Sequence, residues 1–246
     1  MTEKERVYRI VFIVFKKEKK MDNRILYMDK DILVAVKPAG MPSLPDKVGS
    51  ASFLEYLGKE VSLPMNTLHP VGRLDRPVGG LILFSLSAKA QKWFSMPSDN
   101  ISFTKGYSTL VYGQWEKKEG ILEDYLIKNE KKNLSRVGTS TEKGAKKAIL
   151  SYKVMREIEE KAVSFLDVSL ITGRHHQIRV QMANAGHAVL GDLKYGQNLL
   201  SHGKTPRMPA LFSSRLSFSF PGKKEGFQFL AAPEKWEPEV FSLLLP

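Results

Sequence analysis

Short apolar segments separated by polar turns follow one another along most of the chain. Residues 25–27 and 32–36 are apolar on either side of a polar turn, which predicts two antiparallel strands. Alternating apolar residues predict a hairpin formed by 148–158 and 162–172, and a last hairpin is predicted over 211–231. Strands and helices mix without the regular alternation typical of parallel sheets. The pattern therefore favours an α+β fold.

Capping residues and apolar spacing place the helices. One short helix is predicted over 52–60, and Ser87 can cap a second helix over 88–94. A third helix is predicted to begin near His175 and to end before Gly186, because glycine suits the position after a helix end. Further elements are expected as strands over 81–86 and 102–113 and as a short helix near 238–245.

The composition adds a strong positive charge to this picture. The chain has 246 residues, which suits one large domain or two small ones with a substantial core. It carries 38 Lys and Arg against 26 Asp and Glu, a formal net charge of +12. Since each neutralised phosphate releases counterions and adds affinity, this surplus favours a polyanionic partner. Charge alone does not exclude a merely basic protein.

Two segments concentrate the basic residues. Residues 1–20 carry seven basic and three acidic side chains, and we interpret them as a basic N-terminal appendage to one main domain over 21–246. Met1 and Met21 both suit a translation start. Residues 128–147 carry seven basic and two acidic side chains and predict an exposed loop or hairpin. A solvated turn and an RNA contact explain this second segment equally well.

The absence of cysteine removes disulfides, thiolate nucleophiles and cysteine-based zinc sites, and it is compatible with a reducing cytoplasm. No uncharged run exceeds about a dozen residues, well short of the ~20 that span a bilayer. The apolar stretch 10–15 is preceded by acidic residues and followed by lysines, unlike a signal peptide. We therefore expect a cytoplasmic protein without a membrane segment.

Asp75 is the first candidate for chemistry, because it lies between Arg73 and Arg76 directly before an apolar strand. Two nearby guanidinium groups favour an ionised carboxylate, which can act as a nucleophile without a partner base. Pro77 and the glycine pair after Val78 fit a tight turn that a substrate could approach closely. From these residues alone, a structural Arg–Asp pair at a turn is the commoner arrangement.

The second candidate segment contains His175, His176 and Arg179 at the start of the predicted third helix. Adjacent histidines cannot both face one ion, and no carboxylate follows at helical spacing, so we expect no metal site. Arg179 placed against an anionic group elsewhere in the fold is the better interpretation. The predicted buried face of this helix consists of Ile178, Met182 and Ala185.

Together the two segments resemble the RluA-type pseudouridine synthases, which isomerise uridine in ribosomal or transfer RNA. The resemblance rests on Arg73-Leu-Asp-Arg76 and on Thr172-Gly-Arg-His-His-Gln-Ile-Arg179. Further segments match in the same order, namely Lys37-Pro-Ala-Gly-Met-Pro42, Lys105-Gly-Tyr107 and Gly186-His-Ala-Val-Leu-Gly-Asp192. The similarity covers about residues 24–220.

This resemblance implies the pseudouridine synthase catalytic fold over residues 21–246, an α+β fold with a mixed, mostly antiparallel sheet, flanking helices and a central RNA-binding cleft. It implies that Asp75 is the nucleophile that links covalently to the target nucleotide. Arg179 would pair with Asp75, and Tyr107 would stack on the target base. Such an isomerisation needs no metal or nucleotide cofactor.

The partner implied by the resemblance is rRNA or tRNA at a looped or single-stranded site, where a base is splayed out at lower cost. Arg73 would help to displace the flipped nucleotide. The other expected RNA-binding residues are Arg76, Lys37, Lys105, Arg174 and His176. We expect the protein to act as a monomer.

The chain also departs from the family pattern. Gly72 stands where the family usually has His, and Val78-Gly79-Gly80 stands where it usually has Thr-Ser-Gly. These departures leave open the target RNA and the geometry of the loop around Asp75. They also keep open a non-catalytic RNA-binding or RNA-chaperone protein on the same fold. A metal-dependent nuclease would need clustered carboxylates, and Asp75 has no acidic neighbour in either motif.

Overall fold

In the computed structural model the chain divides into two compact units. Unit 1 comprises residues 1–105 and 213–237, and unit 2 comprises residues 106–212 and 238–246. The structure describes residues 7–10, 24–46, 49–95, 103–196, 208–220, 225–237 and 239–244. Met21 and most of the basic segment 1–20 lie outside the described residues.

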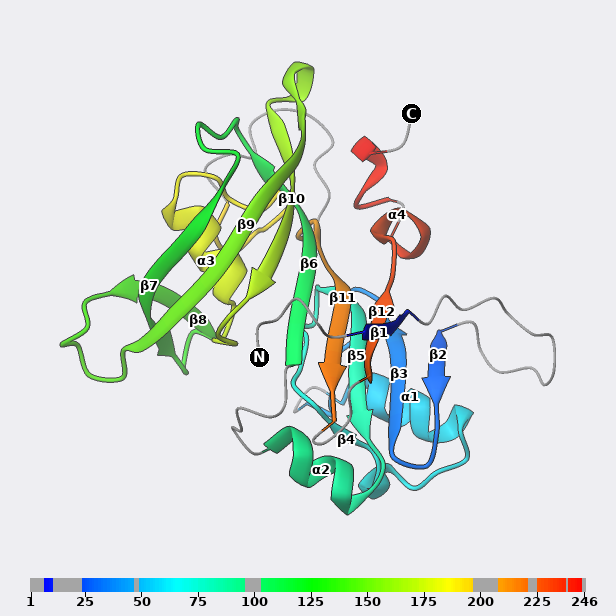
Figure 1. Ribbon diagram of the computed structural model, residues 1–246. Coiled ribbons are helices and arrows are strands. Elements are labelled where there is room, and N and C mark those ends of the chain that lie inside the picture. The colour runs from blue at the N-terminus through cyan, green and yellow to red at the C-terminus, as the bar shows by residue number, and fades with distance from the viewer. Residues whose placement is uncertain are drawn as a thin grey trace. The chain divides into compact units, whose positions relative to one another are not determined.

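Three antiparallel strands lie side by side in unit 1 (Figure 1): β2 (Ile25–Met28), β3 (Ile32–Lys37) and β5 (Gly79–Ser85). The carboxylate of Asp29 accepts two backbone N–H groups of the turn between β2 and β3, both at 2.8 Å. That bonding explains why a short polar turn reverses the chain here. The predicted strand pair is confirmed.

The rest of the unit 1 sheet comes from the two ends of the chain and from one short strand before the Asp75 loop. β11 (Leu211–Ser219) and β12 (Glu225–Leu230) form the predicted C-terminal hairpin. β1 (Val7–Ile10) pairs with β12 in parallel, and β4 (His69–Pro70) pairs with β5. The short β4 leads directly into the segment that carries Asp75.

Local capping explains the helices of unit 1. The hydroxyl of Ser52 and the carboxylate of Glu55 form a capping box at the start of α1 (Phe53–Glu60). The hydroxyl of Ser87 accepts an N–H of the first turn of α2 (Ala88–Ser95) at 3.1 Å. Both predicted helices are confirmed. Shorter helical segments are η2 (Met65–Thr67) and α4 (Pro233–Trp236).

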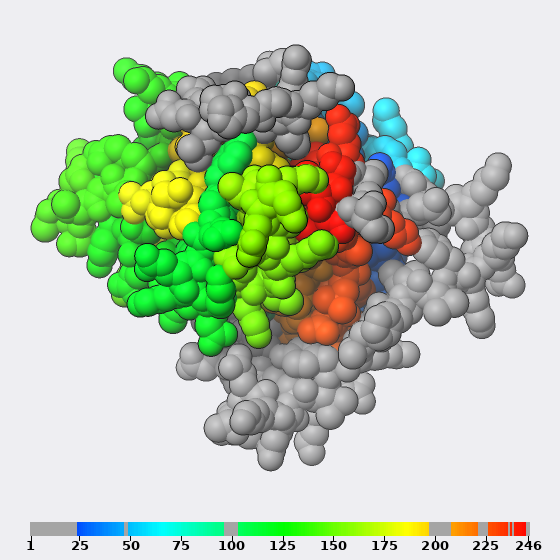
Figure 2. Space-filling model, turned by 90° about the horizontal axis from the view of Figure 1, so that it is seen from above, coloured from blue at the N-terminus to red at the C-terminus, as the bar shows by residue number. Residues whose placement is uncertain are grey.

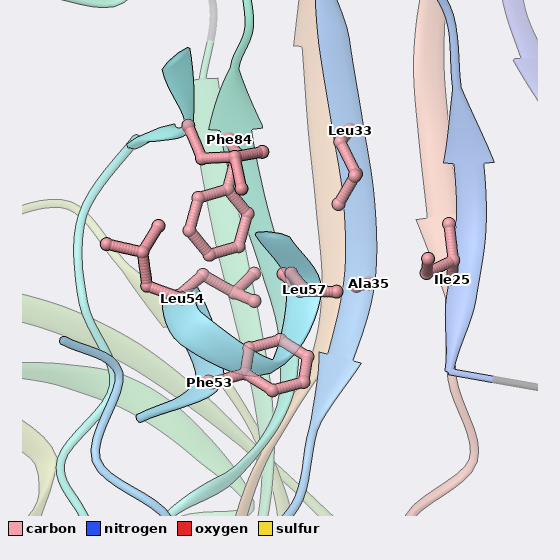
Figure 3. Packing of buried hydrophobic residues seen from close by; sticks show 9 residues of the cluster. Ile25, Leu33, Ala35, Phe53, Leu54, Leu57 and Phe84 are labelled. Atoms are coloured by element: carbon pink, nitrogen blue, oxygen red, sulfur yellow. The ribbon is translucent and has the colours of Figure 1, made fainter. Parts of the chain in front are cut away.

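A buried apolar cluster lies between α1 and the sheet of unit 1 (Figure 3). Phe53 and Leu57 of α1 are fully buried, and they share the cluster with Leu33 of β3 and Phe84 of β5. Burying a side chain of this size contributes about 1.5–3 kcal/mol. Met41 and Leu44 of the segment before α1 also pack against it, so the cluster fixes α1 and these two residues on β3 and β5.

In unit 2 the strands follow the order β6-β10-β9-β7-β8. Their bounds are β6 (Phe103–Tyr112), β7 (Glu119–Asn129), β8 (Leu134–Gly138), β9 (Lys146–Ile158) and β10 (Val163–Leu170). The predicted hairpin of β9 and β10 is confirmed, with η3 (Glu159–Lys161) in its turn. The basic segment 128–147 forms a hairpin from the end of β7, β8 and the start of β9. Figure 2 shows the β9–β10 turn (yellow-green) beside the green segment after β6, where Gly113 N–H donates to the Ala162 carbonyl at 2.7 Å.

Helix α3 (Gln177–Asn184) packs against β7 and β8. Ile178 and Met182 are buried as predicted, and the chain leaves the helix at Gly186 with a φ of 85°. Ala185 is exposed, because α3 has already ended and Ala185 caps it. The predicted C-terminal helix is reduced to η5 (Ser242–Leu244). Among the described residues, no helix has the length and apolar character needed to cross a bilayer.

Candidate active site

The loop that carries Asp75 connects β4 to β5 in unit 1. The Val78 N–H donates to the Asp75 carbonyl at 3.0 Å, which closes a tight turn after the aspartate. Asp75 is partly buried and Arg73 is exposed. Gly80 follows with a φ of 117°, and a Cβ there would collide with the backbone of Ser213. Only glycine therefore allows the chain to enter β5 at this point.

The segment before α1 binds this loop on both sides of Asp75. Ser43 Oγ donates to the Leu74 carbonyl at 2.8 Å and accepts the Leu74 N–H at 3.2 Å. The Gly40 N–H donates to the Arg76 carbonyl at 2.8 Å. Hydrogen bonds thus hold the backbone on both sides of the aspartate, which fixes the position of the Asp75 Cα from which the side chain extends.

Arg76 binds the same segment through its side chain. Its Nε donates to the Gly40 carbonyl at 3.0 Å, and a terminal nitrogen lies 3.3 Å from the Ser50 hydroxyl. Asp46 is 3.6 Å from the guanidinium. Because the side chain is largely exposed, this pair adds little stability. Its expected contact with RNA stays a prediction.

Lys37 is a buried cation beneath the loop. Its side chain is fully buried, and its ammonium donates to the carbonyls of Pro38 at 2.9 Å, Met41 at 2.7 Å and Arg76 at 3.3 Å. Burial lowers the pKa of Lys37 to about 7, whereas the carboxylates of Glu237 and Asp75 act in the opposite direction. A fully buried ammonium has no surface for a phosphate. The expected contact of Lys37 with RNA stays a prediction, and its burial gives that prediction no support.

Lys105 supports the loop from another direction. Its Nζ donates to the Val71 carbonyl at 3.1 Å and lies 5.0 Å from the centroid of the Phe103 ring. Burial of the ammonium lowers the pKa of Lys105 to about 8. A Cβ at Gly72, whose φ is 88°, would collide with that ammonium. The backbone conformation and the Lys105 ammonium thus explain why glycine stands at position 72, where the family usually has His. An RNA contact of Lys105 stays a prediction.

In unit 2, Arg179 forms a buried bidentate ion pair with Asp192. Arg179 Nε lies 2.6 Å from Asp192 Oδ2 and a terminal nitrogen lies 2.8 Å from Oδ1. Oδ1 also accepts the backbone N–H groups of Lys194 at 2.9 Å and Tyr195 at 3.3 Å. The Tyr195 ring lies 5.2 Å from the guanidinium carbon. This geometry fixes the guanidinium of Arg179 in one orientation.

The adjacent histidines connect α3 to β8. Their rings stack with centroids 3.7 Å apart. The His175 ring contacts the Ser135 hydroxyl at 2.8 Å and the Asn133 amide oxygen at 3.0 Å. His176 is buried, with Nδ1 2.7 Å from the Tyr195 hydroxyl. Its burial and this partner argue against the expected contact of His176 with RNA.

The remaining predicted residues also lie in unit 2. Arg174 is exposed, and its Nε donates to the Lys147 carbonyl at 2.8 Å. Tyr107 is a buried residue of β6. Because Asp75 belongs to unit 1 and Arg179 to unit 2, the expected pairing of these two residues stays a prediction.

Comparison with known protein families identifies the family to which this chain belongs. A family model described as RNA pseudouridylate synthase matches residues 31–184, well over half of the chain and the part that contains Asp75, Tyr107 and Arg179. The chain belongs to this family. It is therefore a pseudouridine synthase, an isomerase, as the resemblance of its motifs implied.

Two curated relatives match this synthase over nearly their whole length, and a third, longer one over 70% of its length. It is 28% identical to tRNA pseudouridine synthase C of Vibrio parahaemolyticus, covering 89% of this chain and 93% of the relative. It is 30% identical to the dual-specificity RNA pseudouridine synthase RluA of Pasteurella multocida, over 85% and 92% of the two chains. An uncharacterised RNA pseudouridine synthase of Aquifex aeolicus is 31% identical over 88% and 70%.

Solved structures agree on the fold. The synthase is similar to human RNA pseudouridylate synthase domain containing 1, with a TM-score of 0.67 and 19% identity over 92% of this chain and 89% of that one. At this identity the likeness shows the fold alone. It confirms the predicted α+β pseudouridine synthase fold.

The sequence did not predict two carboxylate contacts, one to Arg179 and one to the turn beside the Asp75 loop. Asp192 ends a motif that was matched to the family, but the partner of Arg179 was sought elsewhere. Glu237 binds the backbone N–H of Ala39 at 2.7 Å from 198 positions away. No local pattern signals a contact of that kind.

Proposed function

We propose that this synthase isomerises specific uridines of transfer or ribosomal RNA, with Asp75 as its nucleophile. The observation that carries the proposal is the family match across the Asp75 loop, whose backbone is bonded on both sides of the aspartate. The similarity to a tRNA pseudouridine synthase and to a dual-specificity RNA pseudouridine synthase supports these two classes of RNA. The net charge of +12 suits a polyanionic substrate.

In the proposed reaction the Asp75 carboxylate bonds to the target nucleotide at the ribose C1′ or at C6 of the base. The N-glycosidic bond breaks, the uracil rotates and C5 bonds to C1′. The bond to Asp75 then breaks, which releases the product and regenerates the carboxylate. The proton on C5 is lost and N1 gains one, so no atom is gained or lost overall. Since the aspartate has to meet one carbon atom, a fixed loop backbone lowers the entropic cost of attack.

Arg179 and Tyr107 complete the proposed site. Arg179, oriented by Asp192, would pair with Asp75 and favour its ionised form. Tyr107 would stack on the target base. This part of the proposal requires both side chains to lie beside Asp75 in the RNA complex, and a crystal structure of that complex would test it.

We further propose that residues 21–246 act as one catalytic domain, with 1–20 as an appendage, in a cytoplasmic monomer. Exposed cations are the proposed contacts to RNA phosphates. They are Arg73, Arg76 and Arg174, together with the basic hairpin 128–147. The looped or single-stranded form of the target follows from the need to flip the uridine out of a stack.

Replacing Asp75 tests the central role. Asp75→Asn keeps the size of the side chain and removes the nucleophilic carboxylate, so we expect pseudouridine formation to fall below detection. Wild type and variant would be incubated with transcribed tRNA and rRNA fragments, and products would be read by mass spectrometry after carbodiimide labelling. Filter binding should show nearly unchanged RNA affinity. Glu119→Gln, which removes an exposed carboxylate, is the control and should match wild type.

Two outcomes would contradict the proposal separately. Turnover by Asp75→Asn at the wild-type rate would remove Asp75 from its role while leaving the activity in place. Absence of pseudouridine in every tRNA and rRNA tested, including RNA isolated from cells lacking the gene, would contradict the proposed substrate classes.

A further inference from the structure

Glu237 is a carboxylate that the reaction, as described so far, does not use. It follows α4 and is partly buried. Its Oε1 accepts the Ala39 N–H at 2.7 Å. Burial raises the pKa of Glu237, whereas the bond from Ala39 and the cations Arg24 and Lys37 act in the opposite direction. A carboxylate kept inside the fold next to two cations needs a structural reason.

The absence of a side chain at Gly79 leaves room for the Glu237 carboxylate. A Cβ at Gly79 would lie 2.5 Å from Glu237 Oε1 and 3.1 Å from its Cδ. Gly79 does not have the positive φ that would itself demand glycine, unlike its neighbour Gly80. The three atoms nearest to such a Cβ all belong to the Glu237 side chain. The family usually has Ser at this position, so here the side chain of Glu237 occupies space that a residue at 79 would take.

Glu237 is connected to the Asp75 loop through the Pro38–Gly40 turn. It binds the N–H of Ala39, and the next N–H, of Gly40, donates to the Arg76 carbonyl at 2.8 Å. Lys37, whose charge is favoured by Glu237, donates to that same carbonyl at 3.3 Å. The carbonyl beside the aspartate is therefore held by two donors that the Glu237 carboxylate supports.

We propose that Glu237 is a positioning residue of this synthase, whose carboxylate replaces a side chain at position 79 and fixes the turn that holds the Asp75 loop. The inference rests on the proposed role of Asp75. Loss of the carboxylate leaves the Ala39 N–H without this acceptor and Lys37 without this counter-charge. The loop then gains freedom, and the aspartate loses alignment rather than reactivity.

Substitutions of Glu237 test the role by separating rate from binding. We expect Glu237→Ala to lower kcat by roughly ten- to a hundred-fold, because misplacement by about 1 Å can cost that much. The KM for RNA should stay within about twofold, since the phosphate contacts lie elsewhere. Glu237→Gln keeps an oxygen for the Ala39 N–H but not the counter-charge for Lys37, so it should recover part of the rate. Glu234→Ala, which removes a carboxylate from α4 itself, is the matched control.

Gly79→Ala supplies an independent test of the same contact. In wild type the new methyl group displaces the Glu237 carboxylate, so kcat should fall. In a Glu237→Ala background that space is empty, and adding Gly79→Ala should lower kcat no further. A double-mutant cycle on kcat reports this coupling, with melting midpoints and filter-binding affinities measured on the same preparations.

The possible results separate this inference from the proposed function. If wild type forms no pseudouridine, the proposed function fails. If wild type is active and Glu237→Ala has the same kcat, the positioning role is refuted while the function stands. Additive effects of the two substitutions, or a rate loss that only follows the fraction of unfolded protein, would refute it as well.

Discussion

The buried pair of Arg179 and Asp192 allows the sharpest estimate of a perturbation. Arg179 is 3% exposed and Asp192 is fully buried, with two short hydrogen bonds between them. Asp192→Ala would leave a buried guanidinium without this counter-charge and the N–H groups of Lys194 and Tyr195 without this acceptor. Breaking a buried pair in this way costs about 3–5 kcal/mol of unfolding free energy.

Thermal unfolding followed by circular dichroism measures this cost. For a chain of this size each kcal/mol lowers the melting midpoint by roughly 2–4 °C, so Asp192→Ala should lower it by roughly 6–20 °C. Glu142→Ala is the control, because Glu142 also pairs with an arginine, Arg136 of β8, but both of these side chains are exposed. We expect little change there, since exposed pairs add little.

A midpoint for Asp192→Ala within a degree or two of wild type would refute the reasoning. It would mean that the charge of the buried Arg179 guanidinium does not depend on Asp192 for its stabilisation. Asp192→Asn divides the effect further, since the amide keeps one oxygen for the N–H groups of Lys194 and Tyr195 but presents an amino group to the guanidinium. Its midpoint should lie between those of wild type and Asp192→Ala.

Two predictions concern the cations beneath the Asp75 loop. The pKa of Lys37 is about 7 in the folded protein, whereas the ordinary value for lysine is 10.5. Between these pH values the unfolded chain therefore binds more protons than the folded one. The free energy of unfolding rises with pH there, by at most ~1.4 kcal/mol per pH unit. Lys37→Met should remove that part of the slope in urea titrations between pH 7 and 10, and an unchanged slope would contradict the assigned pKa. Gly72→Ala should destabilise by about 1–2 kcal/mol from its left-handed backbone alone, and by more while Lys105 is present. Equal losses in wild type and in Lys105→Ala would show that the ammonium does not occupy that space.

The fold was predictable where its causes are local. The capping box of Ser52 and Glu55 and the alternation over 148–158 act within a few residues, and both predicted elements are present. Residues 128–147 read only as a polar loop or hairpin, because β7, β8 and β9 pair there with few apolar residues facing inward.

The roles of charged residues were harder to predict, because burial is decided by distant parts of the chain. Lys37 reads as an RNA-binding lysine from its type and motif, but three carbonyls enclose its ammonium. Glu237 carries no motif at all, and its contact with Ala39 joins residues at opposite ends of the sequence. Patterns of spacing identify the motif that contains Asp75 but not the groups that support it.

The two departures from the family pattern have one physical cause in common. At Gly72 and at Gly79 a missing side chain leaves room for a charged group from another element, the ammonium of Lys105 and the carboxylate of Glu237. Each charge then binds backbone at or near the Asp75 loop, at Val71 on one side and at Ala39 on the other. Returning a larger residue to either position alone should therefore harm the enzyme, because the family's usual side chain and the charge that replaces it compete for one space.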